Sequence, residues 1–164
     1  MLKDMRSIIA PAAWNALRRH YKCLRQWINL SSPSKAWNDE PVVRHLNVAL
    51  TSLMERIVGL PLVQSALPLS LFVQPGSPGF VYHTDTSPPF DITMDFVVDH
   101  EGPSPRPLYF CRKNSSGWLP IVERLDLQVG EAVIFRGAEM THWGGDLAKD
   151  THHSIVLLTW QVCD

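Results

Sequence analysis

The stretch Phe80-Val81-Tyr82-His83-Thr84-Asp85 places a histidine and an aspartate at the end of a short apolar run. Residues i and i+2 of a β-strand face the same side, so His83 and Asp85 can contact one metal ion together. Two histidines and one carboxylate form the facial triad that holds iron(II) and leaves three coordination positions open. This stretch therefore predicts two ligands of such a site, and the third has to come from another strand.

His142 is the histidine that we expect to complete the triad. It lies 57 residues beyond Asp85, after an apolar stretch at Glu131–Phe135 and a turn at Gly137. A strand and a turn before it are the context expected of a residue in a neighbouring strand. The sequence thus predicts metal ligands, and catalytic residues, at His83, Asp85 and His142.

After Pro61 the chain alternates short apolar stretches with clusters of proline and glycine. The stretches are Leu69–Val73, Phe80–His83, Asp91–Val98, Leu108–Phe110, Glu131–Phe135 and Ser154–Val162. This rhythm is typical of an antiparallel β-sandwich or barrel, and not of βαβ units.

The first sixty residues contain two stripes of apolar residues at steps of three and four, which predict two amphipathic helices. The stripes are Trp14, Leu17, Tyr21, Leu24, Ile28 and Val43, Leu46, Leu50, Leu53, Ile57. Helices followed by strands indicate an α+β fold with the helices packed outside a β-core. Because 164 residues suit one domain, we expect a single domain over 1–164, with helical support at 1–60 and the β-core at 61–164.

Composition and charge exclude several classes of protein. Hydrophobic residues make up 45% and charged residues 19%, which is ordinary for a globular domain. A net charge of −1 argues against a polyanion-binding role, so we expect no nucleic-acid partner. The three cysteines form no CxxC pair and indicate neither a zinc knuckle nor a disulfide framework. The sequence shows no signal peptide and no membrane-spanning run, so we expect a cytoplasmic protein without a membrane partner.

The order of these segments resembles that of the iron(II)- and 2-oxoglutarate-dependent dioxygenases, in particular their prolyl-4-hydroxylase-like branch. The likeness covers residues 69–162 and is tightest at Val129–Trp143, VGEAVIFRGAEMTHW. This segment looks like one found in small, mostly uncharacterised members of the superfamily. The resemblance implies a double-stranded β-helix core, jelly-roll or cupin-like, with the two N-terminal helices outside.

The resemblance also implies the cofactors: iron(II), 2-oxoglutarate as cosubstrate and O₂, with ascorbate as reductant. The implied reaction is hydroxylation of an amino acid, a peptide or a small metabolite through an iron(IV)-oxo intermediate, while the protein orients the target C–H bond. Asp85 fills the position that related halogenases leave open for chloride, which favours hydroxylation. We expect a small-molecule or peptide substrate, and a homodimer is compatible with so compact a barrel.

The chain departs from the family where the far carboxylate of 2-oxoglutarate is bound. The family places an arginine or lysine there, on the last strand, because a cation pairs with the carboxylate. Here His152, His153 and Ser154 occupy that stretch. Strand alternation puts His152 and Ser154 on one face and His153 on the other, and the family's register favours His152 with Ser154. Arg112 and Arg136 are the alternative anchors.

Further side chains are candidates for contacts with ligands. Tyr82, Thr93 and Tyr109 are candidates for a hydrogen bond to the cosubstrate, although these residue types are as typical of sheet packing. Tyr109, Trp143 and Trp160 are candidates for the substrate pocket, with burial in the core as the alternative.

Two other functions stay open. A cupin-type iron dioxygenase uses no 2-oxoglutarate, because its substrate chelates the metal itself. Cupins usually carry two histidines as HxH, whereas this chain has Asp85 in the second position, which disfavours that class. A non-catalytic binding module on the same barrel would keep His83 and Asp85 only as remnants.

Overall fold

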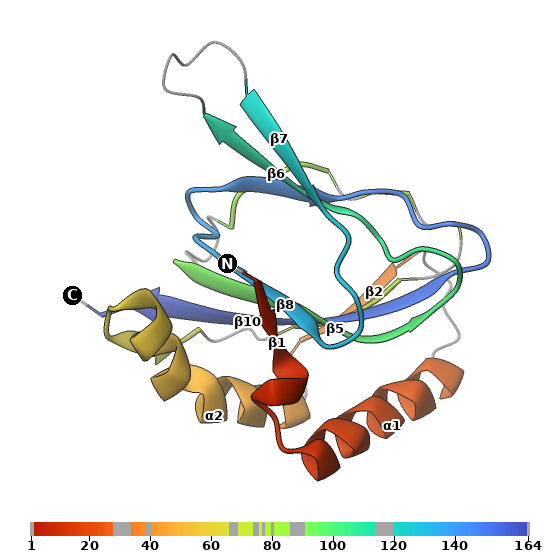
Figure 1. The fold of residues 1–164 in the computed structure, drawn as a ribbon, viewed down its shortest axis with the longest axis horizontal. Coiled ribbons are helices and arrows are strands. Elements are labelled where there is room, and N and C mark those ends of the chain that lie inside the picture. The colour runs from red at the N-terminus through yellow and green to blue at the C-terminus, as the bar shows by residue number, and fades with distance from the viewer. Residues whose placement is uncertain are drawn as a thin grey trace.

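The computed structural model describes residues 2–27, 34–38, 41–65, 69–73, 76, 78–79, 81–85, 91–113 and 120–163. For residues 2, 25–27, 34–38, 69–73, 112–113 and 120–121 it describes the backbone alone. Two helices lie against one face of a large sheet, and a smaller sheet faces its other side (Figure 1).

Both helices begin at a proline, which has no backbone N–H and is favoured in the first turn of a helix. α1 spans Pro11–Trp27 and α2 spans Pro41–Val58. The stripes seen in the sequence face the sheet, with Trp14 and Leu50 among the buried residues. Gly59 follows α2 with a φ of 74°, a conformation that favours glycine. The two expected helices are confirmed, and no helix in the described part of the chain is long and apolar enough to cross a membrane.

The strands form two antiparallel sheets. The larger has seven strands in the order β1-β8-β5-β10-β4-β2, with β3 paired to β10 as well. The smaller has three strands in the order β7-β6-β9. The bounds are β1 Leu2–Asp4, β2 Ser34–Asn38, β3 Leu62–Gln64, β4 Leu69–Val73, β5 Ile92–Glu101, β6 Leu108–Lys113, β7 Pro120–Leu125, β8 Glu131–Phe135, β9 Thr141–Gly144 and β10 His152–Val162. The expected α+β class is confirmed.

Some strands differ from the sequence-based expectation. β1 and β2 lie within the first sixty residues and pair with β8 and β4, so that part of the chain is not purely helical. Of the strand expected at Phe80–His83, the described residues 81–83 form only a bridge from His83 to His142. Segments this short carry too few residues for a periodic pattern, and their pairing partners define them.

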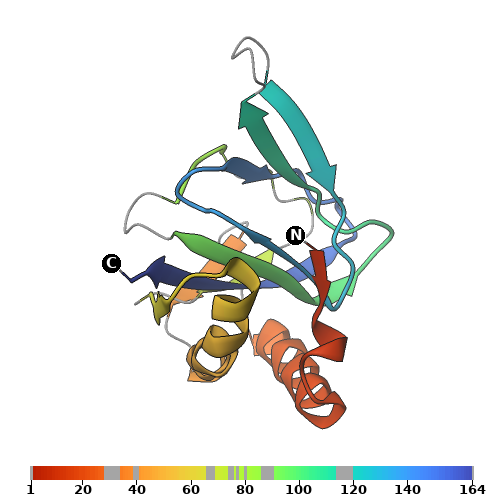
Figure 2. The same cartoon turned by 60° about the vertical axis from the view of Figure 1, so that its left-hand side comes forward.

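The larger sheet buries an apolar core on each face. The outer core packs α1 and α2 against the sheet and includes Met94, Phe96, Ile134, Val156, Leu158 and Trp160. The inner core lies between the two sheets and consists of Val97, Phe110, Leu127, Val133 and Phe135. Figure 2 shows the helices on one side of the larger sheet and the smaller sheet on the other. Strand β5 is therefore buried on both faces.

β5 contains a β-bulge at Val98, since β10 pairs with Val97 and with Asp99 but not with Val98. The extra residue reverses the face of the sheet to which the following side chains of β5 point. Beyond the bulge, Asp99 is directed to α1, with its carboxylate 3.7 Å from the Arg18 guanidinium. His100 is directed inward, where its ring contacts that of His153 at a centroid distance of 5.6 Å.

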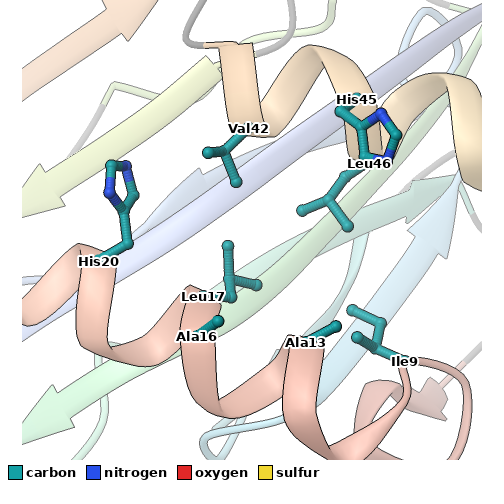
Figure 3. Close-up of a pocket in the computed structure, with 8 residues that line it drawn as sticks. All are labelled: Ile9, Ala13, Ala16, Leu17, His20, Val42, His45 and Leu46. Atoms are coloured by element: carbon teal, nitrogen blue, oxygen red, sulfur yellow. The ribbon is translucent and has the colours of Figure 1, made fainter.

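A groove of about 350 Å³ lies between α1 and α2 (Figure 3). Apolar side chains line most of it, with His20 and His45 among its residues. The helices cover the outer face of the larger sheet, so this groove is separate from the inner core.

Candidate metal centre

Backbone pairing brings His83 and His142 together. The His83 N–H donates to the His142 carbonyl at 3.0 Å, and the His142 N–H donates back at 2.9 Å. Two residues further on, the Asp85 N–H donates to the Gly137 carbonyl at 2.9 Å. The segment from His83 to Asp85 is thereby attached alongside β9, with its i, i+2 pair directed at the His142 side chain.

The potential ligand atoms of His83, Asp85 and His142 converge on one point. All of them lie within 4.8 Å of one another. Asp85 Oδ1 is 3.7 Å from Nε2 of each histidine. A first-row metal ion at about 2.1 Å from each ligand atom places neighbouring ligand atoms about 3 Å apart. The three side chains therefore need to move only slightly closer together to bind such an ion. The residues present therefore fit an iron(II) ion.

Each histidine ring is oriented through its other nitrogen. Nδ1 of His83 donates to the Val81 carbonyl at 2.9 Å, and Nδ1 of His142 donates to the Met140 carbonyl at 3.0 Å. A proton on Nδ1 leaves the lone pair of Nε2 directed toward Asp85. Metal-binding histidines are typically held in this way.

Thr93 of β5 orients the carboxylate. Its Oγ1 donates to Asp85 Oδ2 at 2.8 Å, which leaves Oδ1 facing the two imidazoles. The sequence suggested that Thr93 binds a cosubstrate, whereas in the fold it positions Asp85.

Two phenylalanines enclose His142. The ring of Phe135 contacts it edge-on at a centroid distance of 4.8 Å, and Phe110 lies nearly parallel to it at 6.1 Å. Burial lowers the pKa of His142, against the opposing effect of its Met140 hydrogen bond, which favours the neutral imidazole that binds metal. Neither phenylalanine was singled out from the sequence, because apolar strand residues look alike until their partners are known.

The site is closed on one side and open on the other. The side chains of His142 and Asp85 are 6% and 13% exposed, but that of His83 is 50% exposed. Tyr82 is exposed as well. Ligands can therefore reach the triad from the side of His83.

A second carboxylate lies close to Asp85 inside the barrel. Asp95 is buried in β5, and strand alternation directs it inward between Thr93 and Val97. Burial, together with the charge of Asp85, raises the pKa of Asp95 to about 8. Asp95 was not among the predicted site residues, although an acid inside an apolar strand was a usable signal.

His153, one of the candidate carboxylate anchors on the last strand, lies at the far end of the barrel. It is six residues along β10 from Thr159, which pairs with Thr93. At about 3.3 Å per residue this separation is about 20 Å. Burial lowers the pKa of His153 to about 3, and the nearby His100 and Arg106 act in the same direction. His153 is therefore neutral near pH 7 and carries no charge for a carboxylate.

Of the other anchor candidates, those whose side chains are described also lie away from the inner face of the larger sheet. Ser154 is buried on the face that packs on the helices, so the expected pairing of His152 with Ser154 at a cosubstrate does not agree with the fold. Arg136 is exposed and donates to Glu139 at 2.9 Å. Arg112 lies in β6, but its side chain is outside the described residues.

The aromatic candidates for the substrate pocket do not line the barrel interior. Tyr109 and Trp143 stack at a centroid distance of 5.3 Å. They neighbour the inward-facing pair of Phe110 and His142, so alternation directs them to the outer face of the smaller sheet. Trp160 belongs to the outer core, where its indole donates to Thr51 of α2 at 3.1 Å. For Trp160, burial in the core was the alternative to a place in the substrate pocket, and this alternative agrees with the fold.

Arg106 is a buried cation that the sequence analysis did not single out. Its guanidinium donates to the carbonyls of Gly145 at 2.7 Å and Pro78 at 2.9 Å. Burial lowers its pKa to about 10, which leaves it charged at neutral pH. Its charge acts on His153, so this cation lies at the far end of the barrel.

Comparison with solved structures places this fold among known oxygenases. A prolyl-4-hydroxylase from Pseudomonas putida matches with a TM-score of 0.68 and 11% identity, over 99% of this chain and 92% of that one. A prolyl hydroxylase from Trichoplax adhaerens, in complex with a peptide of the hypoxia inducible factor oxygen degradation domain, matches with a TM-score of 0.71 and 14% identity, over 98% and 82%. The non-haem α-ketoglutarate-dependent epimerase SnoN from nogalamycin biosynthesis matches with a TM-score of 0.65 and 15% identity, over 93% and 84%.

These likenesses concern the fold, because the identities are low. The chain has the double-stranded β-helix fold of prolyl-hydroxylase-like iron(II)/2-oxoglutarate oxygenases, which confirms the expected fold class and resemblance. No family model and no curated protein sequence matches the chain.

Proposed function

We propose that this chain is a non-haem iron(II) oxygenase whose metal is held by His83, Asp85 and His142. The observation that carries the proposal is the convergence of their ligand atoms within 4.8 Å, on a fold shared with oxygenases. Both rings and the carboxylate are also held by second hydrogen bonds, as expected of ligands and not of incidental surface groups.

The bound metal would supply oxygen activation, and the protein would supply orientation and shielding. Thr93 fixes one oxygen of Asp85, and Phe110 and Phe135 keep water from the buried side of His142. The exposed side of His83 leaves an approach for a substrate. Three protein ligands leave three positions for cosubstrate and oxygen.

The first candidate reaction is 2-oxoglutarate-dependent hydroxylation of an amino acid, a peptide or a small metabolite. The solved neighbours with this fold include prolyl hydroxylases, one of them in complex with a peptide. The retained carboxylate at Asp85 supports hydroxylation, since the chain keeps three protein ligands and no position for a halide.

The residues described inside the barrel do not fit a dicarboxylate well. The buried cation Arg106 lies at the far end of the barrel beside the neutral His153, and a carboxyl group at Asp95 lies near the triad. This disagreement favours a second candidate, an oxygenase whose substrate chelates the iron without 2-oxoglutarate.

Anaerobic titration tests the proposal and separates the candidates. Iron(II) should bind with about one equivalent, and addition of 2-oxoglutarate should give a weak visible band near ~500–530 nm if both occupy the open positions. Asp85→Ala and His142→Ala should lose metal binding. His45→Ala, an exposed histidine on α2, is the matched control and should retain it.

The outcomes are distinct. Metal binding with the band supports the first candidate, and metal binding without it supports the second. A wild-type chain that binds no iron(II) would show that the proposal is wrong, and the non-catalytic binding module would then be the alternative to test.

A further inference from the structure

The groove between α1 and α2 lies on the opposite side of the larger sheet from the metal centre, and the proposed function does not use it. Its volume is about 350 Å³, and apolar side chains of both helices form most of its lining. Ala13 and Ala16 of α1 are exposed, and their small side chains leave room opposite Leu46 of α2. Larger side chains of another molecule could therefore enter between the two helices.

Two histidines lie along the groove. Figure 3 shows His20 of α1 near Val42, and His45 further along α2. None of the described residues that line the groove is acidic. His45 also lines an adjoining depression of about 430 Å³, together with Arg44 and the exposed Val48. The apolar lining of the groove thus continues across α2, and basic side chains border it.

The two helices carry an excess of positive charge. α1 contains four arginine or lysine residues and no acid, and α2 contains two arginines and one acid. Arg18 is directed to Asp99 of the sheet at 3.7 Å, whereas Arg19 and Arg44 are exposed. The one acid, Glu55, lies near the other end of α2, where it accepts a backbone N–H of β3 at 3.0 Å. The chain as a whole has a net charge of −1, so this basic helix face favours an acidic partner.

We propose that the groove binds an acidic amphipathic helix of a partner protein. Apolar residues of that helix, at steps of three and four, would fill the space beside Ala13 and Ala16. Its carboxylates would then lie next to Arg19 and Arg44. A helix that lays its apolar face into a groove between two other helices buries the apolar lining and keeps the charged groups at the edge. The inference goes beyond the proposed iron(II) site and does not depend on it.

Charge and shape favour this partner over two others. A second copy of the chain, seated on the same face, would bring cations against cations, which repel each other. An anionic membrane would meet the same cations, but a flat surface leaves the lining of a concave groove out of contact. A rod-shaped acidic partner satisfies both features.

Binding of a synthetic peptide tests the proposal. The probe is a fluorescein-labelled peptide of about 18 residues, or five helical turns, with leucine at steps of three and four and glutamate or glutamine elsewhere. A second peptide has lysine in place of each glutamate. Fluorescence anisotropy measures the affinity of each peptide for the full chain. We expect the acidic peptide to bind about tenfold or more tightly than the basic one, and this difference to shrink in about 0.5 M salt.

Ala16→Trp fills the groove and should weaken binding of the acidic peptide by about tenfold or more, because the indole occupies the space of the apolar side chains. Asn15→Trp is the matched control, since Asn15 is exposed on the same helix but does not line the groove. It should bind the peptide as the wild type does. Circular dichroism checks that both variants keep the fold.

Reversal of charge tests the second half of the proposal. The double variant Arg19→Glu, Arg44→Glu should bind the acidic peptide about tenfold more weakly and the basic peptide more tightly. The double variant Arg124→Glu, Arg136→Glu has the same net charge, but its two exposed residues lie outside the helices. It should keep the wild-type preference.

Each other outcome overturns the inference. These outcomes include no binding of the acidic peptide by the wild type, equal binding of the two peptides, and full binding by Ala16→Trp. Tighter binding to vesicles that contain phosphatidylserine than to the acidic peptide would identify a membrane-binding face. A dimer in sedimentation that Ala16→Trp dissociates would assign the groove to a second copy. Since none of these measurements involves iron(II), failure of the proposed function would leave their result unchanged.

Discussion

The two ends of the inward face of the β5–β10 pair carry different titratable groups, an acid at one end and histidines at the other. Near the metal centre the face carries Thr93 and Asp95, with Asp85 next to them. At the other end it carries His100 and His153, with Arg106 close by. The apolar pair of Val97 and Ile155 lies between the two ends.

This comparison shows how one barrel can hold a metal site and still disagree with the usual cosubstrate. A buried carboxyl group lies near the metal, whereas the cation that a carboxylate would need, Arg106, lies near His153, about 20 Å further along β10. The two ends also respond to pH in opposite directions. The following changes separate them.

Asp95→Asn should have the largest effect on stability. The folded pKa of about 8 is above the ordinary value of 3.8, so between these values the native state binds more protons than the unfolded state. Wild-type stability from this group is present below pH 4 and is lost as the pH rises to 8, with a limiting slope of about 1.4 kcal/mol per pH unit.

The measurement is urea unfolding of the metal-free protein from pH 4 to 9. The unfolding free energy of Asp95→Asn, taken relative to that of the wild type, should rise as the pH increases from 4 to 8, because the variant lacks this decline. Asp126→Asn, at an exposed residue, is the control and should follow the wild type. An unchanged pH profile in Asp95→Asn would show that Asp95 ionises normally.

His153→Gln should remove a pH dependence of stability that has the opposite sign to that of Asp95. The pKa of His153 falls from 6.5 to about 3 on folding, so the native state binds fewer protons between these values. Its contribution is present above pH 6.5 and is lost as the pH falls toward 3, by about 1.4 kcal/mol per pH unit at most. Urea unfolding at pH 4, 5 and 7 measures it. If the difference in unfolding free energy between His153→Gln and the wild type stays constant from pH 7 to pH 4, another group is responsible.

Thr93→Val should weaken iron(II) binding by about 10- to 100-fold, because it removes the hydrogen bond that orients Asp85. Thr159→Val is a well-matched control. Thr159 pairs with Thr93 across the sheet, is equally buried, and its hydroxyl has no hydrogen-bond partner. Competition with a chelator measures both affinities. Equal losses in the two variants would assign the effect to packing.

Arg136→Ala should have the smallest effect. The guanidinium is exposed and paired with Glu139, and such surface pairs contribute less than about 1 kcal/mol. Thermal unfolding and the affinity for 2-oxoglutarate should both stay close to the wild type. A clear loss of 2-oxoglutarate binding would instead restore Arg136 as the anchor.

The sequence by itself determined the two helices, the strands β4, β5, β6, β8 and β10, and the choice of metal ligands. The helices follow from two apolar stripes, and the spacing of His83 and Asp85 follows from the two-residue period of a strand. His142 could be predicted as the third metal ligand because it follows a strand and a turn.

Only the tertiary structure decided which face of each strand points inward. Alternation put His153 and Ser154 on opposite faces, as they are in the fold. However, β5 and β10 are buried on both faces, so the sequence does not indicate which core each of their residues enters. Trp160 therefore packs on α2, and Asp95 enters the barrel next to the metal centre. The bulge at Val98 then reverses the facing for Asp99 and His100, because one extra residue shifts a two-residue period.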